Sequence, residues 1–187
     1  MKFLETPLKG LWLLEPQVHG DHRGWFMESY SKKILERCGA DMEFVQDNHS
    51  YSAQKGVLRG LHFQIPPAAQ TKLVRCTRGA VLDVAADLRR DSATYKQWYK
   101  AELTAANKKL LLIPAGFAHA FLTLENDTEI QYKVDAYYAP EYDRGIRYDD
   151  PDIGIDWGDW GGLGDAPLIL SEKDMRAPLL RDCEPVF

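Results

Sequence analysis

Hydrophobic and polar positions alternate in short runs along most of this 187-residue chain, and turn residues separate the runs. Many runs of strand length at regular spacing are typical of an antiparallel sandwich or barrel. We expect two strands within residues 1–16 and further strands at 24–30, 44–52, 56–64, 71–77, 80–88, 98–103, 109–114, 119–124 and 128–134. A short helix is expected at 32–38, with Ser31 as its N-cap and Gly39 after its end. Residues 157–167, rich in glycine, predict a surface loop.

The run Gly56–Gln64 carries a histidine, an arginine and a glycine side by side. With a period of two, one face of this strand holds Leu58, Gly60, His62 and Gln64, and the other holds Val57, Arg59, Leu61 and Phe63. A glycine inside a strand often marks a bulge or a close ligand approach, and a bulge at Gly60 would turn Arg59 and His62 towards one pocket. The alternative is a half-buried strand with a hydrogen-bonded core histidine.

Alternation places three more polar side chains on inward faces: Lys72, Asp83 and Tyr132. An inward lysine is rare unless it is paired or functional, although Lys72 could also end its strand at the surface. Tyr132 could be an ordinary core tyrosine, and Asp83 could orient a histidine or cap a turn. A histidine base, a lysine and an inward tyrosine together suit proton abstraction next to a carbonyl, with the lysine stabilising the enolate.

Composition excludes several classes of protein. The net charge of −5 gives no basic footprint for nucleic acid, and no apolar run reaches membrane-spanning length. Residues 1–6 lack a signal-peptide core. The three cysteines are scattered without metal-ligand spacing, which predicts a cytoplasmic location. The length predicts one domain over 1–187, with 175–187 as a C-terminal tail.

Two motifs resemble those of the cupin jelly roll: the first histidine strand, and Pro114-Ala-Gly116-Phe-Ala-His119 about fifty residues later along the run of strands. The fold class expected is therefore a mainly β, antiparallel jelly-roll barrel with a few short helices. Metal-binding cupins supply His-x-His and a downstream glutamate, but here Gln64 fills the second slot and no glutamate follows before Lys72. His62 and His119 alone are too few ligands for the usual transition-metal centre, so we expect no metal.

Seven ordered blocks resemble the dTDP-4-dehydrorhamnose 3,5-epimerase family of the cupin superfamily. They are DHRGWFME (21–28), FVQDNHS (44–50), GVLRGLHFQ (56–64), QTKLVRCTRGAVLDVAADLR (70–89), LIPAGFAHAF (112–121), IQYKVDAYYAPEYDRGIRYDDPDIGIDW (130–157) and LSEKD (170–174). The resemblance implies inversion of C3 and C5 of a dTDP-4-keto-6-deoxy sugar. It implies His62 as the base, Asp174 as its partner, Tyr132 as the opposing acid and Lys72 beside the enolate. Asp174 would otherwise be taken for a surface acid.

The resemblance also implies the substrate contacts. Arg23, Arg59 and Lys173 resemble contacts to the pyrophosphate and sugar, and His119 resembles a group near the enolate. Phe26, Glu28, Gln46, Asn48 and Tyr138 resemble nucleotide contacts, with Tyr138 stacked on the pyrimidine. In this family the strand that bears Phe26 and Glu28 reaches into the neighbouring subunit, so a homodimer is implied. No cofactor is expected, because no hydride moves.

Three positions depart from the family pattern. Asp143 stands at a binding position where many members have glutamate, Ala120 replaces a frequent glycine, and Tyr51 stands where a basic residue is frequent. These departures leave the sugar and nucleotide preference open. Two alternatives remain from the sequence: a 3- or 5-mono-epimerase on a related sugar, and a non-catalytic cupin that binds a sugar nucleotide.

Overall fold

The computed structural model describes residues 1–39, 42–158, 163, 167–184 and 187 of the chain. Its strands are β1 (Lys2–Glu5), β2 (Trp12–Glu15), β3 (Val18–Asp21), β4 (Gly24–Met27), β5 (Gln46–Ser52), β6 (Leu58–Gln64), β7 (Lys72–Arg78), β8 (Ala80–Asp87), β9 (Trp98–Thr104), β10 (Leu110–Ile113), β11 (Phe117–Thr123), β12 (Thr128–Val134) and β13 (Asp143–Gly145). Its helices are α1 (Lys32–Leu35) and α2 (Glu172–Met175), with 3-10 turns η1 (Glu36–Cys38), η2 (Pro140–Tyr142) and η3 (Leu180–Asp182).

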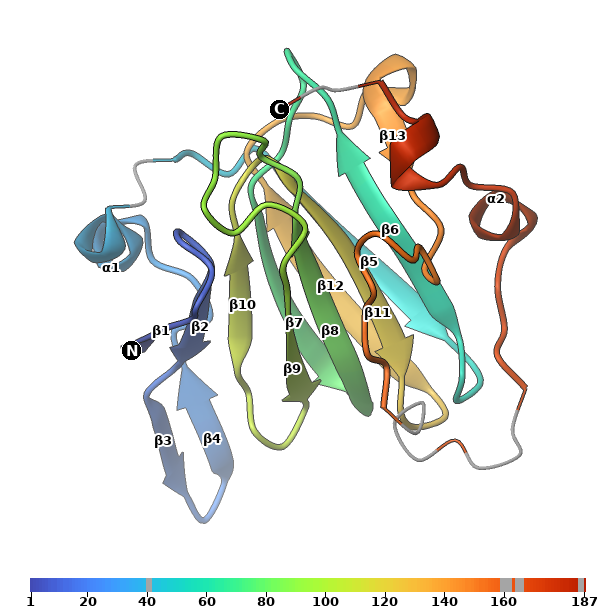
Figure 1. Ribbon diagram of the computed structural model, residues 1–187. Coiled ribbons are helices and arrows are strands. Elements are labelled where there is room, and N and C mark those ends of the chain that lie inside the picture. The colour runs from blue at the N-terminus through green and yellow to red at the C-terminus, as the bar shows by residue number, and fades with distance from the viewer. Residues whose placement is uncertain (40–41, 159–162, 164–166, 185–186) are drawn as a thin grey trace.

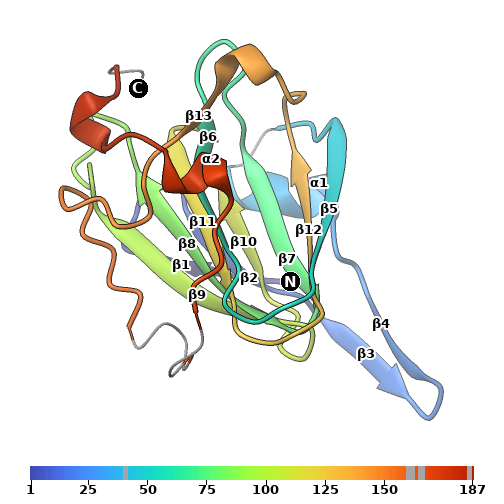
Figure 2. The ribbon, with the colours of Figure 1, turned by 90° about the vertical axis from the view of Figure 1, so that its right-hand side faces the viewer.

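Two large antiparallel sheets lie face to face (Figures 1 and 2). One has the order β1-β2-β10-β7-β12-β5 and the other β13-β6-β11-β8-β9, while β3 and β4 pair only with each other. The main core fills the space between the sheets, with Val74, Leu111 and Ile130 from the first meeting Val81 and Leu103 from the second. This is the mainly β jelly-roll arrangement expected from the sequence.

The outer face of each sheet is also covered. Leu35 of α1 packs on Leu73 and Leu110 of the six-stranded sheet. The segment after β13 crosses the five-stranded sheet and buries Trp157 and Leu163 against it. The expected surface loop at 157–167 was therefore wrong at these two residues, and its residues 159–162 and 164–166 lie outside the described part of the chain.

The predicted strands are found within a few residues of their expected bounds, and so is the helix at 32–38. Ser31 does occupy the N-cap, but its side chain makes no capping hydrogen bond; its backbone carbonyl instead accepts from the amides of Ile34 and Leu35. Strands β3 and β13 were not predicted. The first is exposed at every residue and the second has three residues, so neither leaves a period-two pattern.

Strict alternation along β6 was wrong, because the strand carries the bulge that Gly60 suggested. His62 pairs with His119 and Arg59 pairs with Phe121, so three steps along β6 match two along β11. Arg59 and His62 therefore both line the cavity described below. Gly60 has φ +123°, and a Cβ added to it would lie 2.5 Å from the Cβ of Ala120. Only glycine fits this close approach.

The helices in the described part of the chain are short, and none is long and apolar enough to cross a membrane.

Candidate active site

A cavity of about 740 Å³ opens between the two sheets. It is lined by β5, β6, β7, β11 and β12, and by α2, which contacts β6 (Figure 2). The expected site residues that line it are Gln46, Asn48, Arg59, His62, Lys72, His119, Tyr132, Tyr138, Asp143, Lys173 and Asp174. The fold thus brings together eleven of the fourteen expected residues, from segments more than a hundred residues apart.

His62 and Asp174 form a hydrogen-bonded pair in the cavity wall. The Nε2 atom of His62 lies 2.5 Å from Oδ1 of Asp174, and the Asp174 residue is only 3% exposed. When Nε2 donates to this carboxylate, the other ring nitrogen, Nδ1, carries the free lone pair. The carboxylate therefore fixes the tautomer and the plane of the ring.

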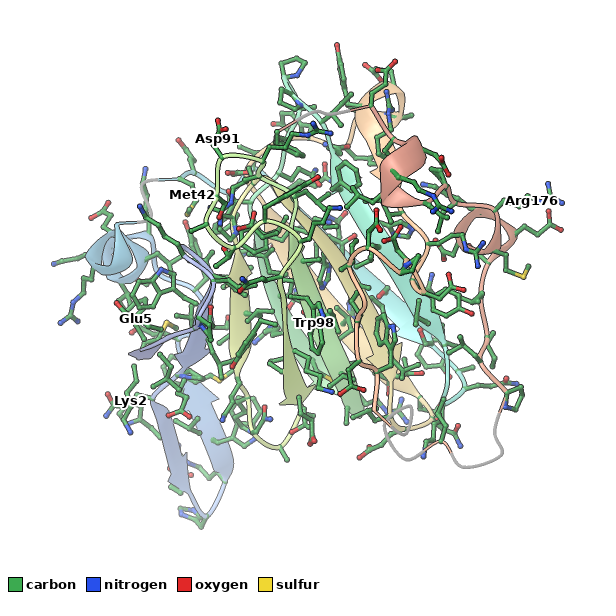
Figure 3. The ribbon with its side chains drawn as sticks, in the orientation of Figure 1. Lys2, Glu5, Met42, Asp91, Trp98 and Arg176 are labelled. Atoms are coloured by element: carbon green, nitrogen blue, oxygen red, sulfur yellow. The ribbon has the colours of Figure 1, made fainter. Side chains whose placement is uncertain are left out.

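Asp174 is itself held by Ser171, a residue that was not singled out from the sequence. The Ser171 hydroxyl donates to Oδ2 of Asp174 at 2.8 Å and accepts from the backbone N–H of Asp174 at 3.1 Å. The pattern Ser-Glu-Lys-Asp matches the sequence signature of a capping box, and Ser171 caps α2 by accepting from the backbone N–H of Asp174. The helix then turns Asp174 inward while Arg176 extends away from the molecule (Figure 3).

The electrostatics of this pair favour an ionised carboxylate. Burial alone would raise the pKa of Asp174, but the hydrogen bond and charge of His62, together with Ser171 and Lys173, outweigh burial and lower the pKa below its ordinary value. A charged Asp174 stabilises the imidazolium that forms when His62 takes up a proton.

His119 and Asp83 form a second, deeper pair. Nε2 of His119 lies 3.0 Å from both carboxylate oxygens of Asp83, which is fully buried. The inward position predicted for Asp83, and its role in orienting a histidine, are confirmed. This pair fixes the His119 ring opposite His62 on the neighbouring strand.

Lys72 is buried at the first residue of β7, so the surface alternative was wrong. Its ammonium donates to the backbone carbonyl of His62 at 3.4 Å. Burial lowers the pKa of Lys72 to about 8, against the charges of Asp143 and Asp83, which raise it. Lys72 is therefore a cation at neutral pH, but its ammonium is more acidic than that of an ordinary lysine.

Tyr132 lines the cavity from β12, next to Val74 of β7. Burial raises the pKa of its hydroxyl, with Asp143 adding to the effect and Arg59 opposing it. The hydroxyl therefore stays protonated well above neutral pH. Because β12 belongs to the six-stranded sheet and β6 to the five-stranded one, Tyr132 and His62 face the cavity from opposite sheets.

Tyr138, Asp143 and Lys173 gather at one part of the cavity wall. Asp143 accepts from the Tyr138 hydroxyl at 3.3 Å and from the Lys173 ammonium at very short range. The hydrogen bond to Asp143 raises the pKa of Lys173. Arg59 lies on β6 and reaches the backbone carbonyl of Tyr51 at 3.4 Å. Cationic and carboxylate groups thus line the same cavity as His62, Lys72 and Tyr132.

Three expected residues lie elsewhere: Arg23, Phe26 and Glu28. The β3–β4 hairpin, which projects from the body of the molecule, carries Arg23 and Phe26 in a separate small hollow, and Glu28 follows it (Figures 1 and 2). Phe26 is 67% exposed. One chain alone does not bring these residues to the cavity.

Within the described residues, no group of three or more His, Cys, Asp and Glu side chains is placed to hold a metal ion. Gln64 stands at the second histidine position of the cupin motif. Its side-chain amide is hydrogen-bonded to backbone atoms.

The chain is similar over most of its length to proteins of one described family. The family model described as dTDP-4-dehydrorhamnose 3,5-epimerase matches residues 5–182. A dTDP-4-dehydrorhamnose 3,5-epimerase of Pseudomonas aeruginosa is 50% identical over 98% of each chain.

Two solved structures are similar over nearly the whole chain. The dTDP-6-deoxy-D-glucose-3,5-epimerase of Legionella pneumophila, in complex with dTDP-4-keto-L-rhamnose, has a TM-score of 0.91 at 43% identity, covering 98% of this chain and 94% of its own. The dTDP-4-dehydrorhamnose 3,5-epimerase of Bacillus anthracis, with TDP and PPi bound, has a TM-score of 0.89 at 49% identity, covering 96% and 99%.

Proposed function

Because the chain belongs to the dTDP-4-dehydrorhamnose 3,5-epimerase family, we propose that its cavity binds a dTDP-4-keto-6-deoxy sugar and inverts the sugar at C3 and C5. The product is dTDP-4-dehydro-L-rhamnose. Similar proteins bear the name of this reaction, and one was solved with dTDP-4-keto-L-rhamnose bound.

The observation that carries the proposal is the placement of an oriented histidine and a protonated tyrosine on opposite walls of one cavity. Inversion requires that a proton leave one face of a carbon and that another proton arrive at the opposite face. A base on the five-stranded sheet and an acid on the six-stranded sheet meet that requirement.

The chemistry follows from the ketone at C4, which acidifies the protons on C3 and C5. His62 takes a proton from one of these carbons, and the electron pair of the C–H bond moves into an enolate with its charge on the C4 oxygen. The Lys72 ammonium stabilises that oxygen. Tyr132, or solvent at one of the two centres, delivers a proton to the opposite face. Exchange with water restores both groups, and the cycle repeats at the other carbon.

Substrate binding is proposed for the remaining residues. Arg59 suits the pyrophosphate, because a guanidinium matches phosphate oxygens with two parallel hydrogen bonds. Tyr138 is 55% exposed at the cavity wall and suits stacking on the thymine base. Asn48, which lines the same cavity, suits a polar contact to the nucleotide. Lys173 and Asp143 would lie along the sugar and pyrophosphate, and His119 would lie near the enolate.

The homodimer is part of the proposal, because Arg23, Phe26 and Glu28 lie outside the cavity of their own chain. The β3–β4 hairpin exposes Trp25 and Phe26, an apolar surface that a second copy would cover. We expect a dimer in analytical ultracentrifugation and a shift towards monomer with weaker substrate binding in Phe26→Asp. A monomeric protein with full activity would contradict the exchange of hairpins.

We further propose a cytoplasmic location, supported by the free thiols of Cys76 and Cys183. Cell fractionation that recovers the protein outside the cytoplasm would contradict it.

The configuration of the product tests the reaction. We expect the protein, treated with a chelator and given no cofactor, to convert dTDP-4-keto-6-deoxyglucose to a product inverted at both C3 and C5 by NMR. Inversion at one carbon would indicate a mono-epimerase, and recovery of unchanged substrate would indicate a binding protein. Loss of activity on chelation would contradict the expectation that no metal is needed.

The pKa of Lys72 predicts a pH dependence. The ammonium is charged below about pH 8 and loses its charge above it, so kcat/KM is expected to fall as the pH rises through 8. Lys72→Met should remove this limb and lower kcat/KM by roughly 10²–10³-fold, the usual loss for an oxyanion donor. Lys109→Met is the matched control, since Lys109 pairs with Glu15 away from the cavity. A wild-type profile that stays flat well above pH 8 would contradict the role of Lys72.

A further inference from the structure

The segment that carries Tyr138 is held by glutamine side chains. Residues 136–139 form no helix or strand, and Tyr137 and Tyr138 are exposed at 69% and 55%. Yet glutamine side chains from three separate places in the fold hold the backbone of all four residues. The glutamines are Gln46 on β5, Gln64 at the end of β6, and Gln70 just before β7.

Gln64 makes the central contacts. Its Oε1 accepts from the backbone N–H of Ala139 at 2.7 Å, and its Nε2 donates to the carbonyl of Tyr137 at 3.1 Å. The same Nε2 donates to the carbonyl of Ala68 at 2.7 Å. Gln64 therefore hydrogen-bonds to the backbone on both sides of Tyr138 and connects this segment to the turn that follows β6.

The other two glutamines complete the support. Oε1 of Gln46 accepts from the backbone N–H of Tyr138 at 3.2 Å, and Nε2 of Gln70 donates to the carbonyl of Ala136 at 2.8 Å. The amide of Gln46 also donates to Oδ1 of Asn48 at 2.8 Å. The oxygen of Gln46 is thus engaged with the loop, whereas the sequence suggested only a nucleotide contact.

Burial makes the arrangement costly to disturb. Gln64 is 4% exposed, and a buried amide is tolerated when its donors and acceptor are paired. Replacing Gln64 would remove the hydrogen-bond partner of the Ala68 and Tyr137 carbonyls and of the Ala139 N–H. The backbone at Tyr138 is consequently fixed, while its ring stays open to the cavity and its hydroxyl reaches Asp143 at 3.3 Å.

Because the backbone at Tyr138 is already fixed, less conformational entropy is lost when a ligand binds to its ring. This is the advantage of preorganisation. We propose that Gln64, supported by Gln70, is a positioning residue for nucleobase binding: it holds Tyr138 at the angle required for stacking. The inference rests on the proposed contact between Tyr138 and the base. It also gives Gln64 a role in a position where a metal-binding cupin would carry a histidine.

The test compares a ligand with a base and a ligand without one. Gln64→Met preserves the volume of the side chain and removes its amide. By calorimetry we expect dTDP to bind this variant about tenfold more weakly, within the range that base–aromatic stacking supplies, whereas inorganic pyrophosphate binds as in the wild type. KM should rise with kcat nearly retained. An equal loss for both ligands, or no loss for dTDP, would overturn the inference.

A double-mutant cycle separates positioning from general damage. In a Tyr138→Ala background, Gln64→Met should cause no further loss of dTDP affinity, because the ring that it positions is gone. Independent, additive losses would overturn the inference. If Tyr138→Ala alone leaves dTDP binding unchanged, the contact between Tyr138 and the base is wrong, and the inference falls with it.

Two further variants guard against a failure to fold. Gln70→Met removes one hydrogen bond to the same segment, so it should weaken dTDP binding less than Gln64→Met does. Unchanged dTDP binding in Gln70→Met would contradict the supporting role of Gln70.

Gln131→Met is the matched control. Gln131 lies on β12, accepts hydrogen bonds from Arg75 and does not line the cavity. We expect it to bind dTDP and pyrophosphate as the wild type does. A dTDP loss in Gln131→Met equal to that in Gln64→Met would contradict the proposed position-specific effect.

Discussion

Replacing His62 with asparagine is expected to lower kcat by about 10³-fold, within the usual range for loss of a general base. Asparagine has no lone pair basic enough to remove a carbon-bound proton. Because one histidine serves both centres, exchange of solvent deuterium should be lost at C3 and at C5 together. Mass spectrometry and NMR of substrate incubated in D2O measure both positions.

His49→Asn provides the control for that experiment. His49 is an exposed histidine of β5 that pairs with Glu129 and does not line the cavity, so full activity is expected. Undiminished exchange in His62→Asn would remove His62 as the base. Exchange lost at only one carbon would show that a second base serves the other centre.

Replacing Tyr132 with phenylalanine is expected to separate proton removal from inversion. The variant keeps His62, Asp174 and Lys72, so the enolate still forms, but the opposite face has lost its acid. Inversion should slow by roughly 10²-fold, the lower range for general acid catalysis. The imidazole of His62 is 32% exposed and can exchange its proton with water, so deuterium should still enter the recovered substrate.

The comparison to make is the ratio of deuterium in recovered substrate to product formed. That ratio should rise in Tyr132→Phe and stay unchanged in Tyr99→Phe, a half-buried tyrosine packed against the same core but outside the cavity lining. An equal fall of exchange and inversion in Tyr132→Phe would contradict the assignment of Tyr132 as an acid acting after proton removal.

Hydrophobic alternation predicted most of the strands, because a half-buried strand must place apolar side chains on one face. It also placed Asp83, Lys72 and Tyr132 inward, as the structure confirms. Where the regular pattern is interrupted, alternation failed: the bulge at Gly60 inserts one extra residue and turns Arg59 to the same side as His62. The glycine signalled the bulge, but its effect on facing depended on the partner strand.

The pairing of His62 with Asp174 joins residues 112 positions apart. No local pattern connects them, and only resemblance to a family suggested the contact. The helix-capping pattern Ser171-Glu-Lys-Asp174 is a local signal in the sequence, but it does not show which side chain Asp174 contacts. The hydrogen bonds of Gln64 could not be predicted for a different reason: its partners are backbone atoms, which carry no sequence signal.

Arg23, Phe26 and Glu28 lie outside the cavity of their own chain, because β3 and β4 pair only with each other and with no strand of the two large sheets. Their assignment to the site depends on a second copy of the chain. The proposed acid–base set of His62, Asp174, Lys72 and Tyr132, by contrast, lines one cavity within one chain.

We propose that one base and one acid on opposite walls of the cavity invert two carbons in turn through enolates. The number and position of deuterium atoms in the product formed by the wild-type protein in D2O test it most directly. We expect deuterium from solvent at both C3 and C5. A product with deuterium at one of these carbons only, or at neither, would contradict it.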